Sequence, residues 1–260
     1  MRAWYIERKL VKPRTCIVIG TPGIGKSFAC GSFLLHQLLH YEGGLLDVVA
    51  YFVRDGAYVI HNARPGVPGS VVQYDNIDAT VNLIVDMARK EKGQKRGFII
   101  VDIGSGFTEP SSALPTNFWP TVVLTSPDVR HYDSWMKDRD GKLIYVNCDD
   151  ERDLKAFVAW QKLFPLGQDA GITDELCKEI SDEWKRVKQR IEQVGPLPRF
   201  VFSRGSFGSR FVELDNAISD ITLNNKAPYM GILRMSSEWQ SDHVSHKLVK
   251  LVRVRVGLNG

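Results

Sequence analysis

A glycine-rich segment of eight residues constrains this chain more than any other feature. It fits the pattern G-x-x-x-x-G-K-[ST], in which backbone N–H groups cradle the phosphates of a nucleotide. The apolar, β-branched run 15–19 precedes it and predicts a buried strand, and the apolar stretch 28–41 after it indicates a helix. Strand, glycine loop and helix form the setting that this motif requires. The residues of the loop are Gly20, Thr21, Pro22, Gly23, Ile24, Gly25, Lys26 and Ser27.

The residue types of this loop predict how it would bind phosphate. Gly23 and Gly25 let the backbone turn where a Cβ atom would clash, so that successive amides can point at one anion. A helix that begins near Lys26 adds its positive N-terminal end. Lys26 is expected to reach the β- and γ-phosphates, and the Ser27 hydroxyl to ligate Mg²⁺. The alternative is an ordinary tight turn that happens to contain Gly-Lys-Ser.

Two later apolar runs are expected to end beside the loop. The run 98–102 closes on Asp102, and an aspartate at the end of a central strand lies beside the Mg²⁺ site in P-loop proteins. The alternative for Asp102 is a carboxylate that caps a turn. The run 121–124 is followed by Thr125, a polar residue expected near the γ-phosphate. The intervening segment 103–120 is rich in Gly, Ser and Pro, and either gates the site or is an irregular surface insertion.

The order of the elements predicts an α/β fold of the P-loop NTPase type, with a doubly wound, parallel five-stranded sheet and a small C-terminal helical lid. A hairpin is expected over 57–72, a helix over 76–90, and a change to helical periodicity from 150, with Trp160 and Trp184 in the core. The five strands are expected at 15–19, 48–53, 98–102, 121–124 and 143–146. The expected division is 1–12, a nucleotide-binding core over 13–149, the helical lid over 150–225, and 226–260.

Composition and charge disfavour a membrane-spanning or secreted protein. The formal charge of +4 on 260 residues is mildly basic and does not by itself favour nucleic acid. No uncharged apolar run approaches the roughly 20 residues of a membrane span, and 1–12 does not resemble a secretory signal. The cysteines lack metal-ligand spacing and are expected to be reduced, buried thiols of a nuclear or cytosolic protein. They are Cys16, Cys30, Cys148 and Cys177. The basic run 247–256 is expected to be a solvated edge strand, with contact to phosphate backbone as the alternative.

The chain closely resembles the retrotransposon hot spot (RHS) proteins of kinetoplastid parasites. The glycine loop is shared with many ATPases, whereas two strings are more specific to the family: HQLLHYE at 36–42 and GPLPRFVF at 195–202. The resemblance runs from about residue 12 onward. It also includes the stretches 31–35, 49–53, 97–100 and 245–249.

The resemblance implies an ATPase-like domain related to the AAA+ and signal-transducing P-loop groups, with ATP and Mg²⁺ as cofactors. It implies residence in the nucleus or cytoplasm, and partners among proteins of nuclear or RNA-associated assemblies, with nucleic acid contacted indirectly. Arg199 occupies the place of a lid arginine that reaches the γ-phosphate; the alternative is a helix-end arginine in a surface pair. Family members are generally longer, so 1–12 is expected to be a remnant and 226–260 a truncated C-terminal segment.

One residue departs from the pattern of active AAA+ ATPases. These enzymes usually follow the Mg²⁺ aspartate with a glutamate that orients the attacking water, whereas this chain has Ile103. Glu109 is a candidate replacement. Loss of a general base costs about 10²–10⁴ in rate, so Mg-ATP binding with slow hydrolysis is expected. A non-catalytic interaction module is the main alternative; a small-molecule kinase is disfavoured, because no Arg-rich lid segment or acceptor site is recognisable.

Overall fold

The computed structural model of the chain describes residues 15–40, 46–53, 56–63, 65–90, 96–103, 109–167 and 171–219. The chain divides into two compact units. The first contains Met1–Ile19 and Lys26–Val146, and the second contains Gly20–Gly25 and Asn147–Gly260. The segments 1–12 and 226–260, and the strand expected at 247–256, lie outside the described residues.

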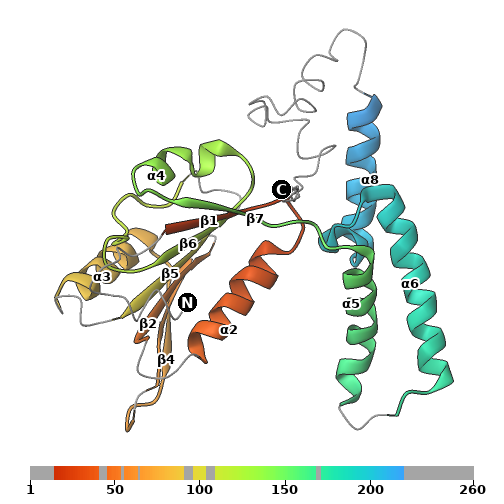
Figure 1. The fold of residues 1–260 in the computed structure, drawn as a ribbon, viewed down its shortest axis with the longest axis horizontal. Helices are drawn as coiled ribbons and strands as arrows, with labels where there is room; N and C mark the ends of the chain where they lie inside the picture. Colours follow the sequence, from red (N-terminus) through yellow and green to blue (C-terminus); the bar gives the residue numbers. More distant parts are fainter. Residues whose placement is uncertain are drawn as a thin grey trace, which may run out of the picture. The chain divides into compact units, whose positions relative to one another are not determined.

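The first unit is built around a seven-stranded sheet of order β4-β3-β2-β5-β6-β1-β7 (Figure 1). The strands are β1 (Thr15–Ile19), β2 (Val48–Val53), β3 (Gly56–His61), β4 (Ser70–Tyr74), β5 (Gly97–Asp102), β6 (Thr121–Thr125) and β7 (Lys142–Tyr145). The five strands expected from the sequence run parallel to one another. The sheet is wider than five strands because the β3–β4 hairpin pairs antiparallel with β2.

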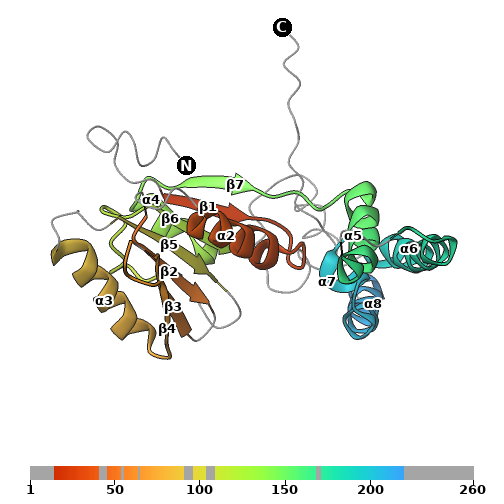
Figure 2. The same ribbon diagram turned by 90° about the horizontal axis from the view of Figure 1, so that it is seen from below.

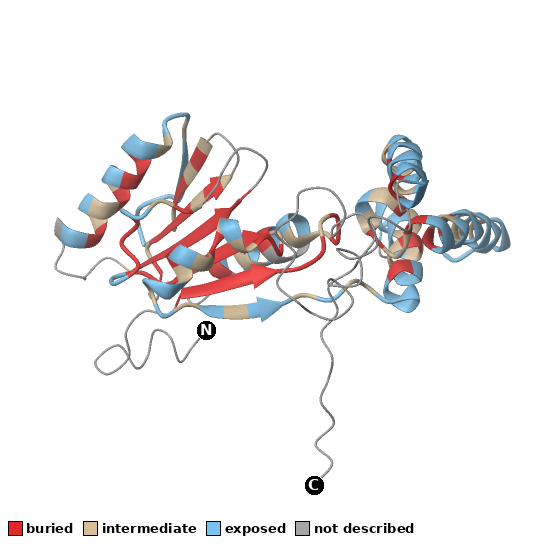
Figure 3. Cartoon of the chain, turned by 90° about the horizontal axis from the view of Figure 1, so that it is seen from above, coloured by how far each residue is buried: buried red, intermediate tan, exposed pale blue. Residues whose placement is uncertain are grey.

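Both faces of the central strands are covered. Every residue of β1, β5 and β6 is buried, as expected of strands enclosed on two sides (Figure 3). Leu38 of α2 (Phe33–Leu39) packs into the cluster on one face. On the other face, Val81 of α3 (Ile77–Lys90) lines a cavity together with Phe52 and Val101. Helices α2 and α3 therefore cover opposite faces of the sheet, as Figure 1 shows.

The helix α3 begins where the sequence predicts. The side chain of Asn76 accepts a hydrogen bond from the Ala79 N–H at 2.9 Å, which satisfies one of the free donors of the first turn. Val81 and Ile84 are buried at the expected spacing. Two short elements follow β6, namely the 3₁₀ turn η2 (Val129–His131) and the helix α4 (Asp133–Lys137).

The second unit is helical within the described residues (Figure 2). Its elements are α5 (Glu151–Leu163), the 3₁₀ turn η3 (Phe164–Leu166), α6 (Asp174–Val194), α7 (Pro198–Val201) and α8 (Arg204–Ser219). Asp150 and Asp153 form a capping box that starts α5, and Gly195, at φ +84°, ends α6. Leu154, Val187 and Val201 belong to one buried cluster between these helices.

Two expectations about burial need correction. Trp184 packs against the helical core, but Trp160 is 49% exposed, so its prediction as a core residue is wrong. Trp160 instead lies among exposed rings at the end of α5, with its centroid 4.8 Å from that of Phe164. Cys16 is buried as expected, whereas Cys177 is exposed and Cys148 is half-buried. Within the described segments, none of the helices has the length and apolarity that a membrane crossing requires.

The start of β5 tolerates no side chain. A Cβ atom added to Gly97 would overlap the indole ring of Trp119, which is 1% exposed. Because that ring is enclosed by the core, Gly97→Ala is expected to lower the free energy of unfolding by about 2–3 kcal/mol. The measurement is urea unfolding followed by circular dichroism. The matched control is Gly208→Ala in α8, where the added Cβ meets no atom within 4 Å. Equal stability of Gly97→Ala and the original chain would contradict this packing.

Candidate functional site

The glycine loop connects the end of β1 to the helix that begins at Lys26. Gly23 and Gly25 have φ values of +89° and +87°, in the left-handed region that favours glycine. The Ile24 N–H donates a hydrogen bond to the Thr21 carbonyl at 3.4 Å, which closes a turn around Pro22. A Cβ atom at Gly25 would meet no atom within 4 Å, so this part of the loop is open. At both glycines the backbone therefore has a conformation that disfavours any side chain.

Within the second unit, the loop contacts α7. The Arg199 N–H donates a hydrogen bond to the Gly23 carbonyl at 3.2 Å. A Cβ atom on Gly23 would come within 2.9 Å of the Phe200 ring. On α8, the guanidinium of buried Arg210 lies over the same ring, 5.2 Å from its centroid. Phe200 is therefore packed between the glycine loop and the interior of the helical unit.

Arg199 is the residue expected to reach the γ-phosphate. Its side chain forms no ion pair with a described residue. The residue is exposed, and its guanidinium has no hydrogen-bond or salt-bridge partner among the described residues. The alternative of a helix-end arginine in a surface pair therefore has no partner in this part of the chain. The guanidinium remains available for a ligand.

In the first unit, Lys26 and Ser27 begin the element η1 (Lys26–Ser32), a π-helix that continues into α2. Single turns of π-helix occur frequently at functional sites. η1 lies against β5 and β6. The approach is close, because a Cβ atom on Gly31 would be 3.1 Å from the Tyr51 hydroxyl and 3.3 Å from Leu124. Ser27 is exposed and Lys26 is half-buried.

The expected polar residues end neighbouring parallel strands. Asp102 is the last residue of β5, in register with Leu124, and Thr125 is the last residue of β6, in register with Ile19 of β1. Because these strands are parallel, Asp102 and Thr125 lie at the same edge of the sheet, where β1 ends. The Thr125 Oγ1 atom is buried and has no hydrogen-bond partner in the described part of the chain. A buried hydroxyl without a partner needs a reason, and a bound ligand supplies one.

Sequence reasoning missed Tyr51, which holds Asp102. The Tyr51 hydroxyl donates a hydrogen bond to the Asp102 carboxylate. Burial raises the pKa of Tyr51 to about 12, and the charge of Asp102 and the hydrogen bond act in the same direction. The contact depends on β2 lying beside β5, with Tyr51 opposite Ile100. Only knowledge of this strand pairing would have identified it.

A cavity of ≈ 340 Å³ adjoins Asp102, and Glu109 and Asp78 also line it. Glu109, the candidate to replace the missing glutamate, therefore shares a cavity with Asp102. Ile103 is 8% exposed, and its N–H donates to the Leu124 carbonyl at 2.9 Å. The position after Asp102 thus belongs to the core and the sheet ladder.

The packing of Gly23 against Phe200 is testable with paired glycine substitutions. Gly25→Ala is expected to cost about 1 kcal/mol of stability, through its left-handed backbone alone. Gly23→Ala adds the collision with Phe200 and is expected to cost about 2–4 kcal/mol. In a Phe200→Ala background the two glycine substitutions should become equal. Urea unfolding of the original chain, the Phe200→Ala chain and the glycine variants of each measures this, and an unchanged difference in the Phe200→Ala background would refute the contact.

The burial of Tyr51 beside Asp102 predicts a dependence of stability on alkaline pH. The folded chain keeps the Tyr51 proton until about pH 12, whereas an ordinary tyrosine ionises near pH 10.0. Above pH 10.0 the unfolded chain releases this proton first, so the stabilisation due to Tyr51 is lost as the pH rises. Burial also raises the pKa of Tyr132 to about 12. Because Tyr132 is present in both chains that are compared, its contribution cancels from the stability difference.

The measurement is the stability difference between the original chain and Tyr51→Phe from about pH 9 to about pH 11. This difference should be constant below the ordinary tyrosine pKa and shrink above it. Tyr74→Phe, on the edge strand β4, is the control for loss of a hydroxyl. A difference that is flat across the whole range would contradict the raised pKa of Tyr51.

Comparison with known proteins adds one match. The family model described as "Retrotransposon hot spot protein, P-loop domain" matches residues 17–260. The match includes the glycine loop, the strand ends and the described helices of the second unit. No curated protein sequence matches the chain significantly.

Proposed function

The chain belongs to the retrotransposon hot spot protein family, and on that premise we propose that it binds Mg-ATP at its P-loop and acts as a slow ATP-dependent switch. One observation carries the proposal. The segment between β1 and η1 holds two glycines in the left-handed region, a conformation from which neighbouring amides can bind one anion. This is the backbone device with which P-loops bind phosphates.

The residues present fit a nucleotide phosphate and its metal ion. The amides of the loop and the N-terminal end of η1 would bind the phosphates, with Lys26 at the β- and γ-phosphates. Ser27 and Asp102 would hold Mg²⁺, and the unpartnered Thr125 hydroxyl would face the γ-phosphate. No group of three or more His, Cys, Asp or Glu side chains in the described segments is arranged to hold a metal ion. Mg²⁺ at phosphate sites is usually held by one or two carboxylates plus phosphate oxygens.

Slow hydrolysis follows from the residue after Asp102. Ile103 is buried and cannot orient water, so that task would fall to another carboxylate, and Glu109, which shares the adjoining cavity with Asp102 and Asp78, is the candidate. Tyr51 donates to the Asp102 carboxylate and so restrains its orientation, which favours a stable metal site. These features favour retention of the nucleotide over rapid turnover.

The proposed role of Arg199 is to sense the γ-phosphate. Its backbone N–H is fixed to the Gly23 carbonyl, so α7 is held against the loop, while its guanidinium is exposed. A change in the loop on nucleotide binding would therefore reach α7 through this hydrogen bond and through Phe200. Such coupling is what a switch requires.

The wider assignments rest on family membership. A relation to the AAA+ and signal-transducing P-loop groups, an origin in a kinetoplastid parasite, and action in the nucleus or cytoplasm are proposals of this kind. Partners in nuclear or RNA-associated assemblies, with any nucleic acid contacted indirectly, are proposals of the same kind.

A non-catalytic interaction module is the second candidate function. It is favoured by the exposed rings of Trp160 and Phe164.

The test of the proposal is ATP binding by the purified chain, measured by calorimetry with and without Mg²⁺. We expect saturable, Mg²⁺-dependent binding that Lys26→Ala weakens by about a hundredfold, since a charged hydrogen-bonding partner of the phosphates is lost. GTP in place of ATP gives the base preference. The matched control is Lys188→Ala on α6, outside the loop.

Circular dichroism establishes that each variant is folded. Equal binding by Lys26→Ala and the original chain would refute the P-loop site. No binding by the folded original chain would leave the interaction module as the function.

Turnover is recorded on the same samples. Phosphate release is expected at a rate well below about 1 s⁻¹, under the range of ordinary enzymes, and Glu109→Gln should reduce it further. Asp102→Asn should weaken binding in Mg²⁺ and leave metal-free binding unchanged. Steady-state turnover at about 10 s⁻¹ would contradict the switch.

A further inference from the structure

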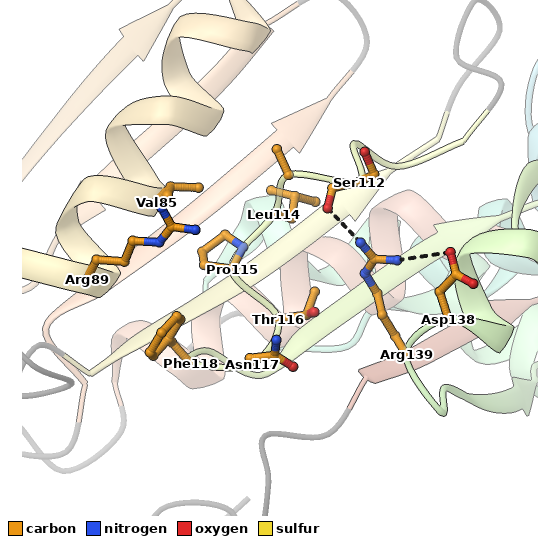
Figure 4. Close-up of a pocket in the computed structure, with 11 residues that line it drawn as sticks. Val85, Arg89, Ser112, Leu114, Pro115, Thr116, Asn117, Phe118, Asp138 and Arg139 are labelled. Atoms are coloured by element: carbon orange, nitrogen blue, oxygen red, sulfur yellow. Dashed lines mark hydrogen bonds and ion pairs between the residues drawn. The ribbon is translucent and has the colours of Figure 1, made fainter.

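A second cavity of the first unit is lined by two arginines from different elements. It has a volume of ≈ 370 Å³. Arg89 reaches it from the end of α3, and Arg139 from the segment after α4. Figure 4 shows both guanidinium groups directed toward the segment 112–118, which lies between them and leads into β6.

Arg139 is held in place by its surroundings. Its Nη2 atom donates a hydrogen bond to the Ser112 carbonyl at 2.6 Å, and its guanidinium lies 4.8 Å from the centroid of the Trp135 ring. The side chain is 14% exposed. Because these contacts fix the guanidinium before any ligand arrives, little conformational entropy is lost when it binds one.

The charge of Arg139 is only weakly compensated. Its nearest carboxylate is that of Asp138, at 3.9 Å, beyond hydrogen-bond distance, and that side chain is 72% exposed. An ion pair of this kind contributes little. The Nε atom is buried and has no hydrogen-bond partner among the described residues. The guanidinium has five N–H donors, and the described residues accept a hydrogen bond from one of them.

The rest of the lining suits an anion with an apolar part. Arg89 is exposed and has no hydrogen bond or ion pair in the described part of the chain. Thr116 and Asn117 add polar groups, and Leu114 and Phe118 provide an apolar wall. Two guanidinium groups thus face the cavity against a single carboxylate that is turned largely to solvent.

We propose that this cavity binds a small organic oxyanion, whose phosphate or carboxylate group lies between Arg89 and Arg139 and whose apolar body packs on Leu114 and Phe118. The planar fork of a guanidinium matches both oxyanions, and the volume is in the range of small-molecule sites. The cavity is distinct from the proposed nucleotide site. Ser112 and Leu114 line both this cavity and the one beside Asp102, so the two cavities adjoin, but neither Asp102 nor any residue of the glycine loop lines the cavity of the two arginines.

The test uses the full chain carrying Lys26→Ala, so that the glycine loop does not contribute phosphate binding. Phenyl phosphate and phenylacetate are titrated separately by ligand-observed NMR, and benzyl alcohol is the neutral probe with a similar ring. Saturable binding of either anion, without binding of benzyl alcohol, is the expected result. Phenyl phosphate alone would identify a phosphate ester as the natural ligand, and both anions would identify oxyanions in general.

Three variants in the same background locate the binding. Arg89→Gln is expected to weaken it about ten- to hundredfold, since one charged hydrogen-bonding partner is lost. Arg139→Gln is expected to abolish it. Because Arg139 also holds Ser112, that variant is checked by circular dichroism, and exposed Arg89 keeps the test decisive if it unfolds. Arg186→Gln, an exposed arginine of α6, is the matched control and should bind normally.

Two results would overturn the proposal. One is the absence of saturable binding of both anions to the folded chain. The other is binding that Arg89→Gln and Arg186→Gln affect equally. An RNA oligonucleotide is titrated as a further probe. If the chain binds the RNA but neither small anion, the proposal is overturned as well.

Discussion

The parallel pairing of β1 with β6 and of β6 with β5 is the constraint on which the candidate site depends. Because the three strands run the same way, the end of β1, Asp102 and Thr125 meet at one edge of the sheet. Complete burial of these strands fixes their register, since any slip would move apolar side chains out of the two packed layers. The glycine loop leaves the sheet at this edge. The position of the proposed ligand therefore follows from ordinary core packing rather than from a dedicated scaffold.

A second constraint joins the loop to the helical unit. Gly23 has no side chain, which lets Phe200 pack against its backbone, and the guanidinium of buried Arg210 lies over that ring. The Arg199 N–H fixes the Gly23 carbonyl at the same point. The Phe200 ring is close-packed between the loop and Arg210 of α8. A change in the loop conformation would therefore displace the ring, and with it α7 and α8. The glycine at this position thus has two functions, one in backbone conformation and one in packing.

The sequence predicts those parts of the structure that depend on local signals. The loop, the five parallel strands, the hairpin and the helix expected over 76–90 were all predicted from spacing and residue type. Tyr51 was not, because its contact with Asp102 requires β2 to lie beside β5, a pairing between strands far apart in sequence. The prediction for Trp160 was wrong for another reason: its residue type favours burial, but the side chain is 49% exposed because tertiary packing leaves it uncovered. The approach of Arg89 and Arg139 to one cavity depends likewise on tertiary packing.

The central claim is that the backbone amides of the loop bind phosphate. Hydrogen–deuterium exchange of the full chain, with Mg²⁺ present and with and without ATP, tests this most directly. Slower exchange is expected in the peptides that cover residues 20–27, with a smaller effect in those that cover α7, which is hydrogen-bonded to Gly23. Unchanged exchange at 20–27 when ATP is shown to be bound would mean that the nucleotide lies elsewhere, and would contradict the account.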